Sequence, residues 1–238
     1  MEKIERDTLI SADENRKMFD RIANTYDIAN RFISLGLDQG WRKKTIKELN
    51  PKEDEYYLDI GTGTGDLAFE LLSQSPQSQV DAIDPSEKML AVARDKALSL
   101  GVSKRPRFQN ADALNLPMPE CFFDGIVSGF CFRNIENRLN ALKEMHRVLK
   151  TSGKLLILEA TYPENSIVRL GYKLYTPFVP LIGKLLGFKQ SYSYLLDSIE
   201  DFPKKEKVIS MFDEVGFKDI QVRSLAFGTV SIFIGRKL

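Results

Sequence analysis

A glycine-rich turn in the first third of the chain has the residue types and spacing of a ligand-binding loop. Residues 56–66 read YYLDIGTGTGD, so three glycines at alternate positions follow a short apolar run. Glycine has no Cβ, which lets the backbone turn sharply and approach a ligand closely. A helix that begins near residue 65 would point its free N–H groups toward the same place. The pattern therefore predicts a ligand site at the C-terminal end of a buried strand.

Two ligand classes compete for this turn, a dinucleotide and S-adenosylmethionine. In the dinucleotide pattern a third glycine would stand at position 66, where this chain has Asp66. A carboxylate at a helix N-terminus would repel phosphates, whereas the sulfonium and ammonium of S-adenosylmethionine are positive and tolerate it. We therefore expect S-adenosylmethionine, and the alternative is a turn that only packs strand against helix. The binding residues expected in this turn are Asp59, Gly61, Gly63 and Thr64.

Acidic residues follow the next two apolar runs. Asp84 ends the second run, where its carboxylate can accept hydrogen bonds from both ribose hydroxyls; the alternative is an N-cap of the next helix. Asp112 and Ala113 follow the third run. There the carboxylate can accept from an adenine amine while the backbone contacts the ring edge, and the alternative for Asp112 is an ordinary turn residue. These residues extend the expected cofactor site along one edge of a sheet.

The elements that must position these residues alternate between buried strands and helices, which is typical of a parallel α/β sheet with both faces covered. The expected strands are 56–60, 79–84, 106–110, 123–129 and 154–159, and the expected helices between them are 65–73, 86–99 and 136–149. After residue 160 the alternation stops. It resumes with a helix at 203–214 and strands at 217–225 and 227–236, whose short link through Gly228 predicts an antiparallel hairpin.

The sequence thus predicts one α/β, Rossmann-like domain over residues 1–238, with a mostly parallel seven-stranded sheet and a C-terminal antiparallel hairpin. Residues 14–50 are expected to form a helical N-terminal arm, with its helix over 14–48 broken near Gly36. Residues 161–200, rich in Tyr and Pro at their start, are expected to form an inserted lid. Both additions would lie outside the repeating strand and helix pattern.

Composition excludes several functional classes. The 34 basic and 33 acidic side chains give a net charge of +1, which provides no general attraction for nucleic acid. With two cysteines and one histidine, the chain has no Cys/His zinc site or two-histidine metal motif, and we expect no metal. The N-terminus lacks the pattern of a signal peptide. The ten-residue run 174–183 is too short to span a membrane, so we expect a cytoplasmic protein.

The chain resembles the ubiquinone/menaquinone biosynthesis C-methyltransferase family, within the class I S-adenosylmethionine-dependent methyltransferases. The stretches that carry the resemblance are FDRIANTYDIANRFISLGLDQGWR at 19–42, LDIGTGTGDLA at 58–68, FCFRN at 130–134 and SYSYLLDSIEDFP at 191–203. The resemblance extends from about residue 15 onward. One departure lies at Gly129, where the family often has a serine that contacts the cofactor.

The resemblance implies methylation of a ring carbon on a prenylated quinol, most closely demethylmenaquinol to menaquinol. It implies Gly129 as a cofactor contact and Arg133, Asn134 and Tyr26 as catalytic residues. Arg133 would stabilise the forming phenolate, and Tyr26 or a water would relay a proton, oriented by Asn134. The alternatives are a plain salt bridge for Arg133 and a core aromatic for Tyr26. For the whole chain they are another lipid or small phenol as substrate, or a quinol-binding subunit without activity.

Residues 161–196 suggest where a water-insoluble substrate would enter. The segment is apolar and aromatic, and residues 162–190 carry a net charge of +3. Such a cover could line the path of a prenyl tail and make peripheral contact with anionic membrane lipid at the inner face of the membrane. The alternatives are that these side chains complete the core or form the face of a homodimer.

Overall fold

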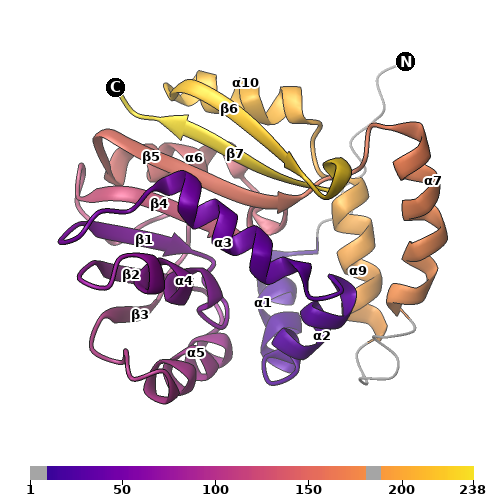
Figure 1. Ribbon diagram of the computed structural model, residues 1–238, viewed down its shortest axis with the longest axis horizontal. Coiled ribbons are helices and arrows are strands. Elements are labelled where there is room, and N and C mark those ends of the chain that lie inside the picture. The colour runs from indigo at the N-terminus through magenta and orange to yellow at the C-terminus, as the bar shows by residue number, and fades with distance from the viewer. Residues whose placement is uncertain (1–9, 181–188) are drawn as a thin grey trace.

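The computed structural model describes residues 10–180 and 189–238, built around a seven-stranded sheet (Figure 1). Its strands are β1 (Tyr56–Ile60), β2 (Gln79–Asp84), β3 (Pro106–Asn110), β4 (Phe123–Gly129), β5 (Leu149–Ala160), β6 (Lys218–Leu225) and β7 (Val230–Arg236). The order across the sheet is β3-β2-β1-β4-β5-β7-β6, and β7 runs antiparallel to both of its neighbours. The mostly parallel sheet and its closing antiparallel hairpin are confirmed.

Helices cover both faces of this sheet (Figure 1). The helices of the described residues are α1 (Ala12–Ile22), α2 (Tyr26–Ile33), α3 (Leu37–Leu49), α4 (Asp66–Gln74), α5 (Glu87–Ser99), α6 (Arg138–Val148), α7 (Ser166–Tyr175), α9 (Lys189–Glu200) and α10 (Lys205–Val215). Apolar side chains of α3 and α4 pack on one face, and those of α6 and α10 pack on the other. Short 3-10 turns, η1 (Phe132–Asn134), η2 (Thr176–Phe178) and η3 (Ala226–Gly228), complete the described chain.

The central strands show why the sequence builds a sheet covered on both sides. In β1, Leu58 and Ile60 are buried in the cluster on the α6 and α10 face, while Tyr57 is buried on the α3 and α4 face. Successive side chains of a strand point to opposite faces, so a run of apolar residues requires cover on both. This packing fixes the C-terminal ends of β1, β2 and β4 along one edge of the sheet.

The N-terminal arm has one more break than the sequence suggests. The predicted helix over 14–48 is three helices, α1 to α3, interrupted at residues 23–25 as well as near Gly36. Ser11 and Glu14 begin α1 with reciprocal side-chain and backbone hydrogen bonds, which fixes its start at Ala12. The extra break lets α2 turn and lie across the edge of the sheet where the glycine-rich turn stands (Figure 1).

Two boundaries near the end of the sheet also differ from expectation. The fifth strand starts at Leu149 instead of residue 154, because a register shift opposite Phe123 and Gly125 lets this turn-like stretch pair with β4. The last strand starts at Val230 instead of residue 227, because η3 occupies the link. Ala226 and Phe227 in this link both have a positive φ.

The described part of the predicted lid is helical. Asn165 begins α7 by accepting hydrogen bonds from two backbone N–H groups, and α7 and α9 stand beside each other at one end of the sheet (Figure 1). Residues 181–188, which include Lys184, lie outside the described part, as does the side chain of Lys189. Within residues 10–180 and 189–238, none of the helices combines the length and the apolar character that crossing a membrane requires.

Candidate active site

The glycine-rich turn joins β1 to α4, as its sequence predicts. Gly61, Gly63 and Gly65 all have a positive φ, which other residues rarely adopt. A Cβ on Gly61 would lie 2.1 Å from the Sγ atom of Cys131, in the loop after β4. The turn therefore needs glycine both for its own shape and for its contact with the neighbouring strand end.

Asp59 lies beneath this turn and is completely buried. Its Oδ2 accepts hydrogen bonds from the Thr62 hydroxyl at 2.6 Å and from the Ala68 N–H at 3.2 Å. Its Oδ1 has no hydrogen-bond partner among the described residues. Burial raises the pKa of Asp59 to about 7, against the opposing effect of these hydrogen bonds. A buried, unpartnered acceptor at this point fits a ligand that brings a donor or a positive charge.

Asp84 ends β2 and connects that strand to the glycine-rich turn. Its Oδ2 accepts the Gly63 N–H at 2.8 Å, and its Oδ1 accepts the Ser86 N–H at 2.8 Å. The N-cap of α5 is Ser86, whose hydroxyl accepts the Met89 N–H, so the capping alternative for Asp84 does not describe its position. Burial raises the pKa of Asp84 to about 6.

The remaining predicted cofactor residues lie on the same edge of the sheet. Asp112 is exposed after β3, and its Oδ1 accepts the Leu114 N–H at 2.9 Å within a turn, with Ala113 between them. Gly129 ends β4, where a Cβ would lie 2.6 Å from Leu67. The turn and the C-terminal ends of β2, β3 and β4 thus lie along one edge of the sheet, while Asp112 also makes the turn contact that the sequence left as its alternative.

Asp66, whose carboxylate at the helix N-terminus is expected to repel phosphates, has cationic partners in the structure. Its carboxylate lies 2.6 Å from Nζ of Lys96 and 3.2 Å from Nη2 of Arg31, in an arm helix. These cations balance the charge, so its repulsion of phosphates is weaker than the sequence argument assumes.

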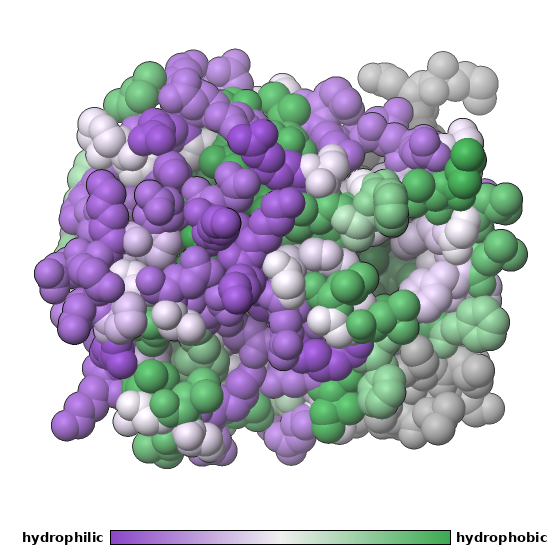
Figure 2. Space-filling model, in the orientation of Figure 1, coloured by the Kyte–Doolittle hydropathy of each residue, from purple (hydrophilic) through white to green (hydrophobic). Residues whose placement is uncertain are grey.

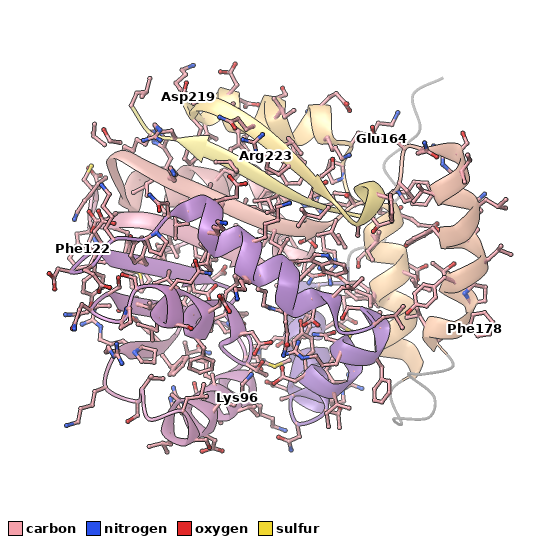
Figure 3. All side chains as sticks on the ribbon, in the orientation of Figure 1. Lys96, Phe122, Glu164, Phe178, Asp219 and Arg223 are labelled. Atoms are coloured by element: carbon pink, nitrogen blue, oxygen red, sulfur yellow. The ribbon has the colours of Figure 1, made fainter. Side chains whose placement is uncertain are left out.

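Thr64 turns toward the same arm. Its hydroxyl donates to Oδ1 of Asp27 in α2 at 2.6 Å, and Asp27 pairs with Nζ of Lys96 at 2.7 Å. Lys96 on α5 (Figure 3) therefore joins Asp27 of the arm to Asp66 of α4. We call Asp27, Thr64, Asp66 and Lys96 the arm latch, because they fasten the arm over the glycine-rich turn.

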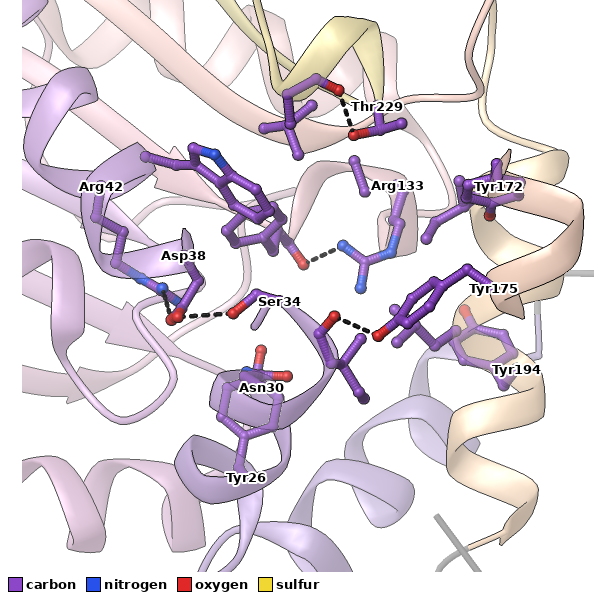
Figure 4. Close-up of a pocket in the computed structure, with 18 of the residues that line it drawn as sticks. Tyr26, Asn30, Ser34, Asp38, Arg42, Arg133, Tyr172, Tyr175, Tyr194 and Thr229 are labelled. Atoms are coloured by element: carbon purple, nitrogen blue, oxygen red, sulfur yellow. Dashed lines mark hydrogen bonds and ion pairs between the residues drawn. The ribbon is translucent and has the colours of Figure 1, made fainter. Parts of the chain in front are cut away.

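A cavity of about 480 Å³ lies between the arm, the loop after β4, the lid helices and η3 (Figure 4). Its walls are mainly apolar and aromatic. The polar side chains among its lining residues are Tyr26, Asn30, Ser34, Asp38, Arg42, Arg133, Tyr172, Tyr175, Tyr194 and Thr229. Tyr26 connects the two sites, since its ring lies 4.0 Å from the position a Cβ on Gly63 would take. The cavity and the glycine-rich turn therefore share a wall.

Arg133 is the buried cation in this wall. Its Nη1 donates to the Phe130 carbonyl at 2.6 Å (Figure 4) and to Oε1 of Glu159 at 2.7 Å, and its Nε lies 3.3 Å from the Ser198 hydroxyl. Its Nη2 has no acceptor within hydrogen-bond distance among the described residues. Burial alone would lower the pKa of Arg133, but the charge and hydrogen bond of Glu159, together with the nearby Tyr26 and Tyr194, outweigh it, so the pKa is raised and the side chain stays a cation.

Of the other two predicted catalytic residues, Tyr26 lines the cavity and Asn134 does not. Tyr26 lines the cavity, and burial raises its pKa although the Arg133 charge and a hydrogen bond with Asn30 oppose this. Asn134 is not among the lining residues; its side-chain oxygen accepts from the Tyr194 hydroxyl at 3.3 Å, and Tyr194 does line the cavity. Asn134 thus reaches the cavity only through Tyr194.

Sequence reasoning missed Glu159 and Ser198, which hold Arg133. Glu159 ends β5 fully buried, and its carboxylate also accepts the backbone N–H groups of Arg133 and Ala160. The sequence signal was a carboxylate near the end of an apolar strand. A charge is rarely buried there without a partner, so this signal could have predicted a basic residue beside Glu159. The lid tyrosines carried a weaker signal, an unusual density of Tyr after residue 160.

Comparison with known proteins supports one family. Residues 8–237 match the model of the ubiE/COQ5 methyltransferase family. A demethylmenaquinone methyltransferase of Bacteroides fragilis is 37% identical over 228 residues, which cover 95% of this chain and 93% of the relative. A ubiquinone/menaquinone biosynthesis C-methyltransferase of Geobacter sulfurreducens is 37% identical over 224 residues, covering 93% of this chain and 88% of the relative.

The fold is also found among solved structures. A SAM-dependent methyltransferase from Aquifex aeolicus superimposes with a TM-score of 0.67 at 20% sequence identity, covering 92% of this chain and 98% of that one. At that identity the likeness concerns the fold, which is the one expected from the strand and helix pattern.

Proposed function

We propose that this chain, which belongs to the ubiE/COQ5 methyltransferase family, methylates a ring carbon of a prenylated quinol with S-adenosyl-L-methionine as donor. The observation that carries the proposal is the buried Arg133 cation in the wall of an apolar cavity that adjoins the glycine-rich turn. An apolar cavity with a well-held cation in its wall suits an aromatic ring that develops negative charge on oxygen.

The residues around the turn fit the donor. Its ammonium group suits the unpartnered Oδ1 of Asp59, and backbone atoms of Gly61 and Gly63 offer a close approach. Asp84 is the acceptor for the ribose hydroxyls. The other residues proposed to contact the donor are Thr64, Asp112, Ala113 and Gly129. When bound, S-adenosylmethionine supplies an electrophilic methyl group and leaves as S-adenosylhomocysteine.

The chain's own residues prepare the ring for methylation. Arg133 holds a ring oxygen through its free Nη2 and stabilises the phenolate that makes the ring electron-rich. The raised pKa of Tyr26 keeps its hydroxyl protonated at neutral pH. This hydroxyl hydrogen-bonds both the ring oxygen and a water, and so relays the proton of the ring hydroxyl to that water. Asn134 is a positioning residue that acts through Tyr194. Overall, a ring C–H becomes C–CH₃ and one proton is released.

Demethylmenaquinol is the proposed substrate within the quinol class. The names of two relatives, from Bacteroides fragilis and Lactobacillus johnsonii, specify demethylmenaquinone, while others include ubiquinone. The large aromatic lining of the cavity is compatible with a two-ring naphthoquinol.

A labelled methyl group tests this function. Purified protein is incubated with methyl-labelled S-adenosylmethionine and a short-tailed quinol, reduced in place, of either the naphthoquinol or the benzoquinol type. We expect label on a ring carbon by mass spectrometry, with higher kcat/KM for the naphthoquinol. Label on oxygen, or no transfer to either ring, would contradict the proposal.

The lid adds a proposed partner, the lipid monolayer from which a prenylated quinol must be taken. The residues of α7 that line the cavity are Val168, Gly171, Tyr172 and Tyr175. Those that are exposed on its other side are Ile167, Leu170 and Leu174. Apolar side chains on two sides of one helix need cover on both sides. The exposed Lys173 on this helix favours an anionic surface as that cover.

Other exposed apolar side chains belong to the same face. Ile28, Phe32 and Leu35 of the arm, Phe178 after α7 and Phe227 of η3 are all more than half exposed. Figure 2 shows hydrophobic side chains gathered around a hollow on the side that carries α2 and α7, and Figure 3 shows Phe178 at the outer edge of this side. We call this set the lipid face. The alternative is that a second copy of the chain covers this face in a homodimer, and an experiment must distinguish this from lipid binding.

A further inference from the structure

Tyr172 of the lid helix α7 carries a buried hydroxyl that the fold does not use. The side chain lines the cavity, and its hydroxyl oxygen has no hydrogen-bond partner among the described residues. The ring itself is well held, since Tyr162 packs edge-to-face against it with ring centres 5.5 Å apart. A buried hydroxyl without a partner destabilises a fold, so a bound molecule that supplies its hydrogen-bond partner would explain its presence.

Other tyrosines that line the same cavity have their hydroxyl groups satisfied. Tyr175 donates to the Ile33 carbonyl at 2.6 Å (Figure 4), and the Tyr194 hydroxyl accepts from Asn15 and donates to Asn134. These bonds tie the lid to the arm and to the loop after β4. Tyr172 makes no such tie, so its hydroxyl contributes nothing to the assembly of the lid that a phenylalanine would lack.

We propose that the Tyr172 hydroxyl donates a hydrogen bond to the second ring oxygen of the bound quinol, the one opposite the oxygen held by Arg133. This rests on the proposed function, because a 1,4-quinol brings two oxygens and Arg133 accounts for one. Tyr172 would then be a substrate-binding residue that fixes which way the ring lies in the cavity.

The chemistry of the hydroxyl suits this task. Burial raises the pKa of Tyr172, and Glu200 and Tyr162 add to that effect while the Arg133 charge opposes it. The hydroxyl therefore remains protonated and can donate at neutral pH. Because Arg133 stabilises negative charge on one oxygen and Tyr172 offers a neutral donor, the two ring oxygens meet different partners. This difference would decide which of the two ring oxygens becomes the phenolate.

The variant Tyr172→Phe removes only the hydroxyl. We expect KM for a short-tailed naphthoquinol to rise about 3- to 15-fold. Affinity for S-adenosylmethionine, measured by calorimetry, should stay unchanged. The melting temperature of the unliganded protein should stay the same or rise by about 1–4 °C, because an unpartnered polar group has been removed from the interior. Tyr162→Phe, in the partner ring, is the matched control and should leave KM unchanged.

A substrate analogue separates this inference from the proposed function. Binding of a prenyl naphthol with a single hydroxyl should be equally tight for the wild type and Tyr172→Phe, since the second oxygen is absent. If the wild type methylates no quinol, the proposed function fails. If the wild type is active but Tyr172→Phe keeps the wild-type KM, or lowers the melting temperature, the hydroxyl has no ligand role and this inference is wrong.

Discussion

Arg133 has a structural role and a proposed catalytic role, because it pairs with Glu159 and also faces the cavity. The pair is buried, so removing the arginine alone leaves an unpaired carboxylate in the interior, at a cost of about 3–5 kcal/mol. Loss of activity in such a variant would therefore mix instability with lost chemistry. The two roles separate only when the charge of Glu159 is removed at the same time.

We expect Arg133→Lys to lower kcat on reduced quinol by about 10- to 100-fold, because an ammonium cannot bond Glu159, Phe130 and a substrate oxygen as a planar guanidinium does. The double variant Arg133→Ala/Glu159→Gln should recover stability relative to Arg133→Ala but keep a kcat lower by about 10²–10³. Single-turnover kinetics and thermal unfolding measure both. Full activity in the double variant would rule out the phenolate role.

Asp84 gives a prediction about cofactor affinity. Losing a charged hydrogen-bond acceptor for the ribose should cost on the order of 2–3 kcal/mol, so Asp84→Ala should bind S-adenosylmethionine roughly 30- to 150-fold more weakly. Asp84→Asn should keep the bond to the Gly63 N–H and lose less. Calorimetry gives the affinities. An unchanged affinity in a folded Asp84→Ala protein would remove Asp84 from the cofactor site.

The same acids predict a pH dependence. Burial raises the pKa values of Asp59 and Asp84 to about 7 and about 6, above their unfolded values near 4. Their contribution to stability is therefore full below about pH 4 and is lost as the pH rises through 6 and 7. The cofactor contacts proposed for Asp59 and Asp84 need their ionised forms, so affinity should fall from pH 8 to pH 5. Calorimetry of cofactor binding across this pH range checks the direction of the change in affinity. The variant Asp59→Asn should flatten part of the profile. An affinity independent of pH would contradict the assignment.

At the scale of elements, the arm latch connects α2 to the glycine-rich turn and to α4. Lys96 links Asp27 in α2 to Asp66 in α4, while Thr64 in the turn holds Asp27 from the other side. The ion pairs are partly exposed, so each contributes modestly and is weakened by salt. Their importance comes from connecting an arm to a ligand loop that otherwise belongs to the core.

We expect Lys96→Met to reduce the free energy of unfolding by about 1 kcal/mol and to speed amide hydrogen exchange in α2 more than in the sheet. The exposed pair of Arg94 and Glu87 on the same helix provides the control, and Arg94→Met should leave exchange in α2 unchanged. Equal exchange rates in α2 for wild type and Lys96→Met would show that the latch does not hold the arm.

At the scale of the whole molecule, cavity and exposed apolar side chains lie on one side. The cavity is lined by the inner side of α7, and the lipid face is formed by its outer side together with the arm and η3. A tail that leaves the cavity on this side would enter the lipid directly. Under the proposed function, this arrangement would join substrate binding to the surface from which the substrate is taken.

The double variant Leu170→Glu/Leu174→Glu tests the lipid face within the described residues. We expect it to lose most co-sedimentation with anionic vesicles and to slow turnover of long-tailed quinol, with activity on a short-tailed analogue retained. Leu98→Glu, an equally exposed apolar position on α5, should change neither. If the wild type ignores vesicles at low salt, and the double variant instead converts a dimer to a monomer in sedimentation velocity, the face is a dimer interface.

Most of the fold was predictable because it depends on local patterns. Short apolar runs separated by helical spacing require a sheet covered on both faces, and the glycines at 61, 63 and 65 could only form a tight turn. The break at residues 23–25 and the early start of β5 were not predictable. Both depend on what the chain packs against, namely the edge of the sheet for α2 and the paired strand β4 for β5.

The sequence by itself determined the chemistry that the residues offer: a glycine-rich turn, acids after successive strands, and Arg133 after the fourth. Only the tertiary structure decided how each is used. It neutralises Asp66 with Lys96 and Arg31 and moves Asn134 behind Tyr194. It also pairs Arg133 with a glutamate 26 residues away. Charges and hydrogen bonds act over a few ångströms, and those distances between remote residues exist only once the chain has folded.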